Sequence, residues 1–287
     1  NVASGSLDLL TGDEVITAFE HETFASFPKG NYTASSPVIS YWNTFFQGLR
    51  QCYIFLENVD KVPDLTESVK TDYIAQVKFL IAYYHYQLAR CYGPIILIKE
   101  LPDVNASQAE YLPRTSYDEC VDWICNLLDE AASSLPAIRT NKEDYGLATS
   151  VGAKAVKAKM LLYAASPLFN GNSSFYSNFT DKSGSQLMPL TYDPNKWVKA
   201  KTAIKEAIDL AEQNGHALYV KQDYKIGNED ANPYPAAGPV RCLRTSLVDW
   251  DSRNPEVLLA ETRSEGSYGI QNLSLIHISE PTRLRRI

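Results

Sequence analysis

The sequence lacks the motifs that mark the most familiar catalytic and nucleotide-binding sites. It contains no HExxH, GxSxG, P-loop or GxGxxG pattern, so zinc peptidase, serine hydrolase and nucleotide-binding functions have no support from it. It also contains no run of about eighteen apolar residues, the length that a helix needs in order to span a bilayer. We therefore expect neither an enzyme of these classes nor a membrane-spanning helix.

Metal-binding and nucleic-acid-binding patterns are missing as well. The cysteines are scattered, form no CxxC motif and do not cluster with the four histidines: Cys52, Cys91, Cys120, Cys125 and Cys242. Because this arrangement gives no zinc signature, we expect no metal, no cofactor and mostly buried thiols. The net charge of −7 argues against a nucleic-acid partner, since such proteins present a basic surface to phosphates.

The sequence is instead rich in tyrosine, with 18 residues, and several of them lie in residues 76–93 (QVKFLIAYYHYQLARCYG). Apolar side chains recur there at the spacing of one α-helical face: Phe79, Ala82, Tyr83 and Tyr86. Gly93 and Pro94 mark the end of this helix. We expect the helix to be central, with a packing role for His85.

Helical spacing recurs along most of the chain. It predicts helices at about residues 38–60, 67–91, 116–135, 149–165 and 195–213. Ser116 and Glu119 have the spacing of a capping box. The small residues Ala153, Ala155 and Ala158 permit close contacts between helices. The predicted fold is mainly α, a tetratricopeptide-like superhelix of antiparallel helical pairs.

Between the helices, two long stretches read as loops. Residues 26–37 and 169–192 are rich in Asn, Ser, Gly and aromatic residues, and loops as long as the second are usually functional or disordered. The chain also reads as a loop from Gly215 to Asp251. Residues 254–260 are predicted to form a short strand or the start of another helix.

The last residues have an unusual origin. Residues 273–283 read LSLIHISEPTR, which resembles the translation of a transposon-type sequencing adapter. We therefore expect the natural sequence to stop near Asn272, with residues 273–287 a library artefact, and we do not interpret their arginines as a basic tail.

Blocks of residues with a characteristic order run along residues 42–260. They are Trp42, Phe46, Leu49 and Asn58; residues 76–93; Arg114, Glu119, Ile124, Asp129, Ala132 and Leu135; residues 153–171; residues 197–211; and Asn254 to Val257. Together they resemble the SusD/RagB family of surface nutrient-binding lipoproteins of Bacteroidetes-type outer membranes. The chain departs from the family pattern at Gln76, Ile81 and Leu147, where we expect effects on packing or local ion pairs.

The resemblance implies a function and partners. A SusD-like protein captures oligosaccharide, or in some cases peptide, and passes it to a TonB-dependent transporter of the SusC type. It implies a cell-surface lipoprotein of the outer membrane, held by an amino-terminal lipid. We expect residues 1–272 to be a partial SusD-like helical domain that lacks the signal, the lipid-bearing cysteine and most of the carboxyl-terminal half. Alone, it is expected to fold incompletely.

The resemblance also indicates where ligand would bind. In the family, contacts come from loops before the first helix, which implies Asn31, Tyr32, Tyr41 and Trp42, although Trp42 also suits core packing. The second loop adds Phe175 and Tyr176. Flat aromatic rings and neighbouring amides suit the apolar faces and hydroxyl groups of sugars.

Two other functions remain as alternatives. A tetratricopeptide-type adaptor would bind a partner peptide, and its aromatic residues would line the inner helix face instead of loop tips. A glycosidase would need a pair of carboxylates, for which Asp249, Asp251 and Glu256 beside Trp250 are the candidates. Nothing else in the sequence supports catalysis, so we predict a binding protein and no enzyme.

Overall fold

The computed structural model describes residues 26–27, 29–33, 35–38, 40–103, 105, 112–220, 238–248 and 254–260. The chain divides into two units, Asn1–Asn43 with Thr262–Ile287, and Thr44–Glu261. Each unit is described by itself. The predicted artefact, residues 273–287, lies outside the described residues.

The described residues are mainly helical, as predicted. The α-helices are α2 (Trp42–Asn58), α3 (Glu67–Tyr92), α4 (Tyr117–Ser134), α5 (Ser150–Ala165), α6 (Ser173–Tyr176), α7 (Asn195–Gln213) and α8 (Pro239–Val248), with short 3-10 turns at Val59–Lys61 and Lys142–Asp144. In this part of the chain, β-structure is limited to isolated bridges, Thr33 with Ser36 and Thr180 with Gln186.

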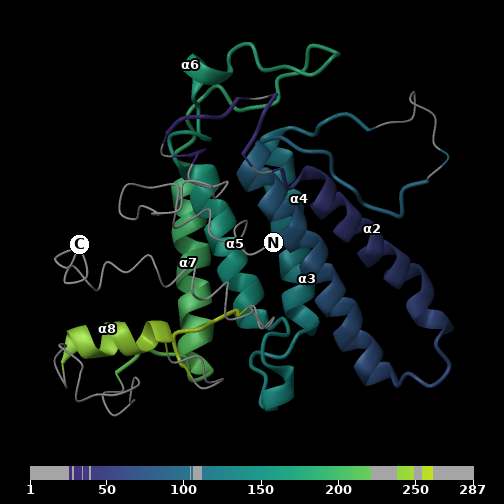
Figure 1. Cartoon of the computed structure of the whole chain (residues 1–287), viewed down its shortest axis with the longest axis vertical. Coiled ribbons are helices and arrows are strands. Elements are labelled where there is room, and N and C mark those ends of the chain that lie inside the picture. Colours follow the sequence, from purple (N-terminus) through teal and green to yellow (C-terminus); the bar gives the residue numbers. More distant parts are fainter. Residues whose placement is uncertain are drawn as a thin grey trace, which may run out of the picture. The chain divides into compact units, whose positions relative to one another are not determined.

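Helices α3, α4, α5 and α7 pack in sequence order. Helix α3 contacts α4, α4 contacts α5, α5 contacts α7, and α3 also reaches α5, so these helices run side by side (Figure 1). Small residues bring α5 and α7 together, because Ala158 packs against Ala203 and Ala207. The predicted close contact through alanine is confirmed at Ala158; Ala153 is also buried, whereas Ala155 is half-buried.

Ion pairs join α4 to α5. Asp129 accepts hydrogen bonds from Lys154 (2.7 Å) and Lys157 (2.6 Å). Burial of Asp129 opposes its ionisation, but these two ammonium groups outweigh burial and lower its pKa. The ionised carboxylate therefore connects the two helices.

Helix ends agree with the predictions in one case and contradict them in another. At the end of α3, Gly93 has a φ of +70°, and its N–H donates to the Ala89 carbonyl at 2.9 Å. The capping box of α4 is not formed, because Ser116 makes no side-chain cap bond. Instead, the Tyr117 N–H donates to the Leu187 carbonyl at 2.8 Å. A distant segment thus satisfies the amide of the first residue of α4, which is not one of the amides that a capping box binds.

Three element predictions were wrong. Helix α2 begins at Trp42, four residues later than expected, and α8 occupies part of a stretch that was read as a loop. Residues 254–260 form turns instead of a strand or helix. There the Asn254 side chain accepts from the Glu256 N–H at 3.1 Å and donates to the Ser246 carbonyl at 2.9 Å, so a side chain replaces regular backbone pairing.

His85 connects α3 to the extended segment that follows it. Its Nδ1 lies 2.8 Å from the Ile81 carbonyl, and its Nε2 accepts from the Ile98 N–H at 3.1 Å. The ring is fully buried and meets Trp123 of α4 edge-on at 4.8 Å. The expected packing role is confirmed, and burial lowers the pKa of His85 to about 4.

This pKa predicts a loss of stability on mild acidification. Because the folded-state pKa lies below that of the unfolded chain, the unfolded chain binds the proton first as the pH falls from about 6.5 to about 4. We expect the free energy of unfolding to fall by about 2 kcal/mol between pH 7.5 and pH 5 through His85 alone. Urea titrations at both pH values measure this, and His85→Gln should flatten the dependence. An equal pH dependence of the free energy of unfolding in the unsubstituted protein and in His85→Gln would contradict this prediction.

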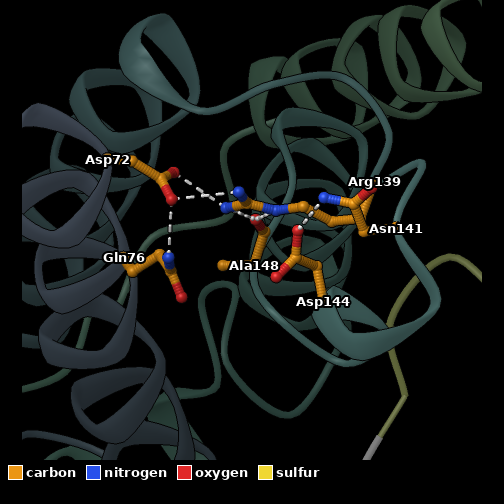
Figure 2. A network of polar contacts seen from close by, with 6 residues as sticks. All are labelled: Asp72, Gln76, Arg139, Asn141, Asp144 and Ala148. Atoms are coloured by element: carbon orange, nitrogen blue, oxygen red, sulfur yellow. Dashed lines mark hydrogen bonds and ion pairs between the residues drawn. The ribbon is translucent and has the colours of Figure 1, made fainter. Parts of the chain in front are cut away.

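A second connection joins the start of α3 to the segment between α4 and α5. Arg139 donates to both carboxylate oxygens of Asp72, at 3.0 and 2.8 Å, and to the Ala148 carbonyl at 2.8 Å. Figure 2 shows this network, in which Gln76 also donates to Asp72 at 2.9 Å. The departure from the family pattern at Gln76 therefore adds a donor to a carboxylate that already binds a guanidinium.

We expect Arg139→Lys to lower the free energy of unfolding by about 1–3 kcal/mol. An ammonium group cannot reproduce the two-pronged contact, and it would leave the Ala148 carbonyl short of a donor. Chemical unfolding measures the change. Lys78→Ala is the control, because it removes an exposed ion pair with Glu130 that is expected to contribute about 0–1 kcal/mol. Equal decreases in the free energy of unfolding for Arg139→Lys and Lys78→Ala would show that the two-pronged contact contributes no more than an exposed ion pair.

Candidate ligand-binding loops

The first candidate loop, residues 26–41, belongs to the smaller unit. Its turn is closed by the Gly30 N–H, which donates to the Phe27 carbonyl at 2.9 Å, with Gly30 at a φ of +67°. The turn brings the rings of Phe27 and Tyr32 to 5.2 Å. Tyr32 is 51% exposed and Asn31 is exposed beside it, so both are accessible, as a ligand contact requires.

Tyr41 and Trp42 differ from these two residues in exposure. Both are half-buried, and Trp42 is the first residue of α2. The intermediate exposure of Trp42 is compatible with both roles predicted for it, a ligand contact and core packing. The ligand contacts predicted for all four residues stay predictions.

The second candidate loop, residues 169–192, belongs to the larger unit and extends from the end of α5. The Asn172 side chain caps α6 by accepting from the Phe175 N–H at 3.3 Å. Phe175 is 73% exposed, whereas Tyr176 is half-buried. The ring of Tyr176 lies 6.4 Å from that of Phe175 and 6.2 Å from that of Phe179.

Phe179 was missed as a candidate from the sequence. Its three-residue separation from Tyr176, across a short helix and a turn, was the available signal. The Gln186 side chain fixes this stretch by donating to the carbonyls of Tyr176 (2.8 Å) and Phe179 (3.2 Å). Phe175, Tyr176 and Phe179 therefore form one row of rings, which we call the aromatic row.

The tip of the loop is held by its own hydrogen bonds. The Asp181 carboxylate accepts from the Ser183 hydroxyl (2.7 Å), the Ser183 N–H (2.8 Å) and the Ser185 N–H (2.8 Å). These bonds, of which the one from the Ser183 hydroxyl is the strongest influence, lower the pKa of Asp181. The charged carboxylate thus organises the turn that follows the aromatic row.

The base of the loop is anchored in the core. Asn170 is buried and pairs with the Asp193 backbone, donating to its carbonyl and accepting from its N–H, both at 2.9 Å. Phe169 stacks on the buried Tyr117 at 4.9 Å, and burial raises the pKa of Tyr117. A loop that is rich in polar residues is therefore fixed at both ends, which favours a defined ligand surface.

The other candidates for chemistry have structural roles or lie outside the described residues. Asp249, Trp250 and Asp251 are not described, and Glu256 accepts from the Tyr219 N–H at 2.9 Å. Burial raises the pKa of the Cys52 and Cys120 thiols to about 11 and that of Cys125 to about 12. Among the described residues, no group of three or more His, Cys, Asp or Glu side chains is arranged to hold a metal ion.

Comparison with known proteins identifies the family. Residues 14–162, about half of the chain, match the family model SusD-like_3, described as "Starch-binding associating with outer membrane". The chain belongs to the SusD-like family. SusD-like proteins are binding proteins, and the family description associates them with the outer membrane. No curated protein matches the chain.

Solved structures agree with this family. BT4246 is 31% identical, with a TM-score of 0.78 over 92% of this chain and 48% of BT4246. The SusD-like protein BF3747 from Bacteroides fragilis NCTC 9343 is 22% identical, with a TM-score of 0.55 over 75% of this chain and 36% of BF3747. Surface glycan-binding protein A from Bacteroides uniformis is 20% identical, with a TM-score of 0.52 over 77% of this chain and 42% of that protein.

These similarities confirm the tetratricopeptide-like SusD fold predicted from the sequence. The chain spans less than half the length of each of these proteins. In the described part of the SusD-like chain, no helix is long and apolar enough to cross a bilayer.

The loop base provides a test of how the aromatic row is positioned. At Gly171, which has a φ of +77°, an added Cβ would lie 2.3 Å from the Tyr192 nitrogen. We expect Gly171→Ala to lower the free energy of unfolding by about 2 kcal/mol or more, since strain and a backbone clash act together. It should also expose residues 173–186 to limited proteolysis.

Gly184→Ala is the matched control for this substitution. Gly184 has a φ of +87°, but no atom lies within 4 Å of its added Cβ. Gly184→Ala should therefore lower the free energy of unfolding only by the conformational cost of about 1–2 kcal/mol. It should not make residues 173–186 more susceptible to limited proteolysis. Equal proteolysis of both variants would contradict the anchoring described here.

Proposed function

We propose that this protein captures oligosaccharide at the outer-membrane surface without cleaving it. The observation that carries the proposal is the match to a SusD-like family model described as starch-binding. The aromatic row supports it, because an exposed ring such as Phe175 can stack on the apolar face of a sugar. Phe27 and Tyr32 in the other loop have the same chemistry.

The proposal includes delivery and anchoring. The captured oligosaccharide would pass to a SusC-like TonB-dependent transporter, and an amino-terminal lipid would hold the protein on the membrane. Both follow from the family resemblance. The name of surface glycan-binding protein A is in keeping with a glycan ligand. Exposed rings on loops also favour sugar over the alternative of a peptide held on an inner helix face.

Aromatic substitutions test the proposed site. In the product of the complete gene, we expect Phe175→Ala with Tyr176→Ala to weaken oligosaccharide binding about tenfold or more, since each stacked ring contributes about 1 kcal/mol. Tyr32→Ala with Tyr41→Ala should do the same. A glycan array that includes starch-type α-glucan oligosaccharides finds the ligand, and isothermal titration calorimetry measures its affinity.

Ile138→Ala is the control, because Ile138 is an exposed apolar residue in the connection between α4 and α5, a segment that belongs to neither candidate loop. It should leave the affinity unchanged. Unchanged binding in either aromatic pair would remove that pair from the site. Release of new reducing ends from a bound glycan would show catalysis and refute a purely binding function.

A further inference from the structure

The position of the aromatic row depends on hydrogen bonds, because burial does not hold it. Helix α6, which carries Phe175 and Tyr176, has four residues, and none of them is buried. An isolated helix shorter than about 12 residues is marginal in water, so helix propensity does not fix α6 either. The ring contacts within the row, at 6.4 and 6.2 Å, are too weak to order a loop by themselves.

Gln186 supplies a long-range part of these hydrogen bonds. Its side-chain amide donates to the carbonyl of Tyr176, the last residue of α6, at 2.8 Å, and to the carbonyl of Phe179 at 3.2 Å. A carbonyl at the carboxyl end of a helix has no partner inside that helix. The amide therefore caps α6 from a residue ten positions later in the chain, and it holds the backbone of two members of the aromatic row.

The residues that follow Gln186 are fixed to the helical scaffold. Leu187 and Met188 are both buried, and the Leu187 carbonyl accepts from the Tyr117 N–H at the start of α4, at 2.8 Å. Gln186 thus connects a long, packed helix to a short helix that has no buried residue of its own.

We propose that Gln186 is a positioning residue of the ligand site, which holds the aromatic row in the arrangement that oligosaccharide contacts. The proposal rests on the proposed function, since that function assigns the row to sugar binding. A ring surface that is already in place spares the complex the entropy cost of ordering the loop. Without the amide, Tyr176 and Phe179 would sample more orientations, and the affinity would fall although both rings remain.

Gln186→Met tests this role without removing a ring. Methionine has a similar length but no donor, and each carbonyl retains another hydrogen bond. The Tyr176 carbonyl accepts from the Phe179 N–H at 3.0 Å, and the Phe179 carbonyl accepts from the Leu187 N–H at 3.1 Å. We therefore expect the variant to fold.

Isothermal titration calorimetry on the product of the complete gene measures the effect on binding. The titrant is maltoheptaose, a starch-type α-glucan oligosaccharide, or the strongest binder on the glycan array if maltoheptaose does not bind. Gln186→Met should weaken binding about fivefold or more, because two hydrogen bonds that order the row are lost.

Asn214→Leu is the matched control. The Asn214 amide also donates to a carbonyl at the end of a helix, that of Leu210 in α7 at 2.8 Å, but it belongs to neither candidate loop. This variant should leave the affinity unchanged. An equal loss of affinity in Asn214→Leu and Gln186→Met would indicate general destabilisation and overturn the proposal.

Hydrogen exchange gives a measurement that needs no sugar. In the ligand-free protein, Gln186→Met should speed amide exchange in residues 173–179 at least about threefold, because their opening becomes easier. Asn214→Leu should leave the exchange of these residues unchanged. Unchanged exchange in Gln186→Met would overturn the proposal.

A double-mutant cycle separates positioning of the rings from a direct contact between Gln186 and sugar. If Gln186 acts through the rings, Gln186→Met should change the affinity by less than about twofold in a protein that already carries Tyr176→Ala and Phe179→Ala. A further loss of about fivefold in that protein would show that Gln186 acts by another route, which overturns the proposal.

The outcomes also separate this proposal from the proposed function. If the unsubstituted protein binds oligosaccharide and Gln186→Met binds it equally well, the role of Gln186 is refuted and the proposed function stands. If the unsubstituted protein binds no oligosaccharide of the array, the proposed function is refuted, and the role of Gln186 with it.

Discussion

The close packing of α5 is the constraint on which the rest of the larger unit depends. This helix contacts α3, α4 and α7, and it is apolar on several faces because alanine and glycine occupy many of its positions. At Gly152, an added Cβ would lie 3.3 Å from the Leu258 carbonyl, so the chain also approaches α5 closely near its start. Larger side chains at these positions would separate the neighbouring helices.

The position of α5 determines where two surfaces of the larger unit lie. The loop with the aromatic row leaves the end of α5, where Phe169 and Asn170 anchor it. Leu162, near the end of the helix, contributes the α5 side of an apolar groove whose other side consists of Trp197, Ile204 and Ile208 of α7. A rigid helix thus presents a polar, hydrogen-bonded loop with exposed rings at its end and an aliphatic surface along its side. These two surfaces therefore differ in chemistry.

The aromatic residues of the helices and those of the loops differ in burial. Those inside the helices, such as Tyr86 and Tyr117, are buried, and they hold the scaffold together. Those on the loops, such as Tyr32 and Phe175, leave much of their ring surface in solvent. The high tyrosine content alone did not distinguish these two roles, because the same side chain suits a helix interface and a sugar face.

The sequence determined the helices with strong periodic patterns, the stop at Gly93-Pro94 and the family, because these depend on local spacing and on the order of motifs. Tertiary structure decided what depends on distant partners. The Leu187 carbonyl accepted from the Tyr117 N–H at the start of α4, Asp72 and Arg139 met although they are far apart in the chain, and Gln186 bound the carbonyls of both Tyr176 and Phe179. The apolar residues of α7 were evident in the sequence, but only packing on α5 could cover one stripe of them and leave the other exposed.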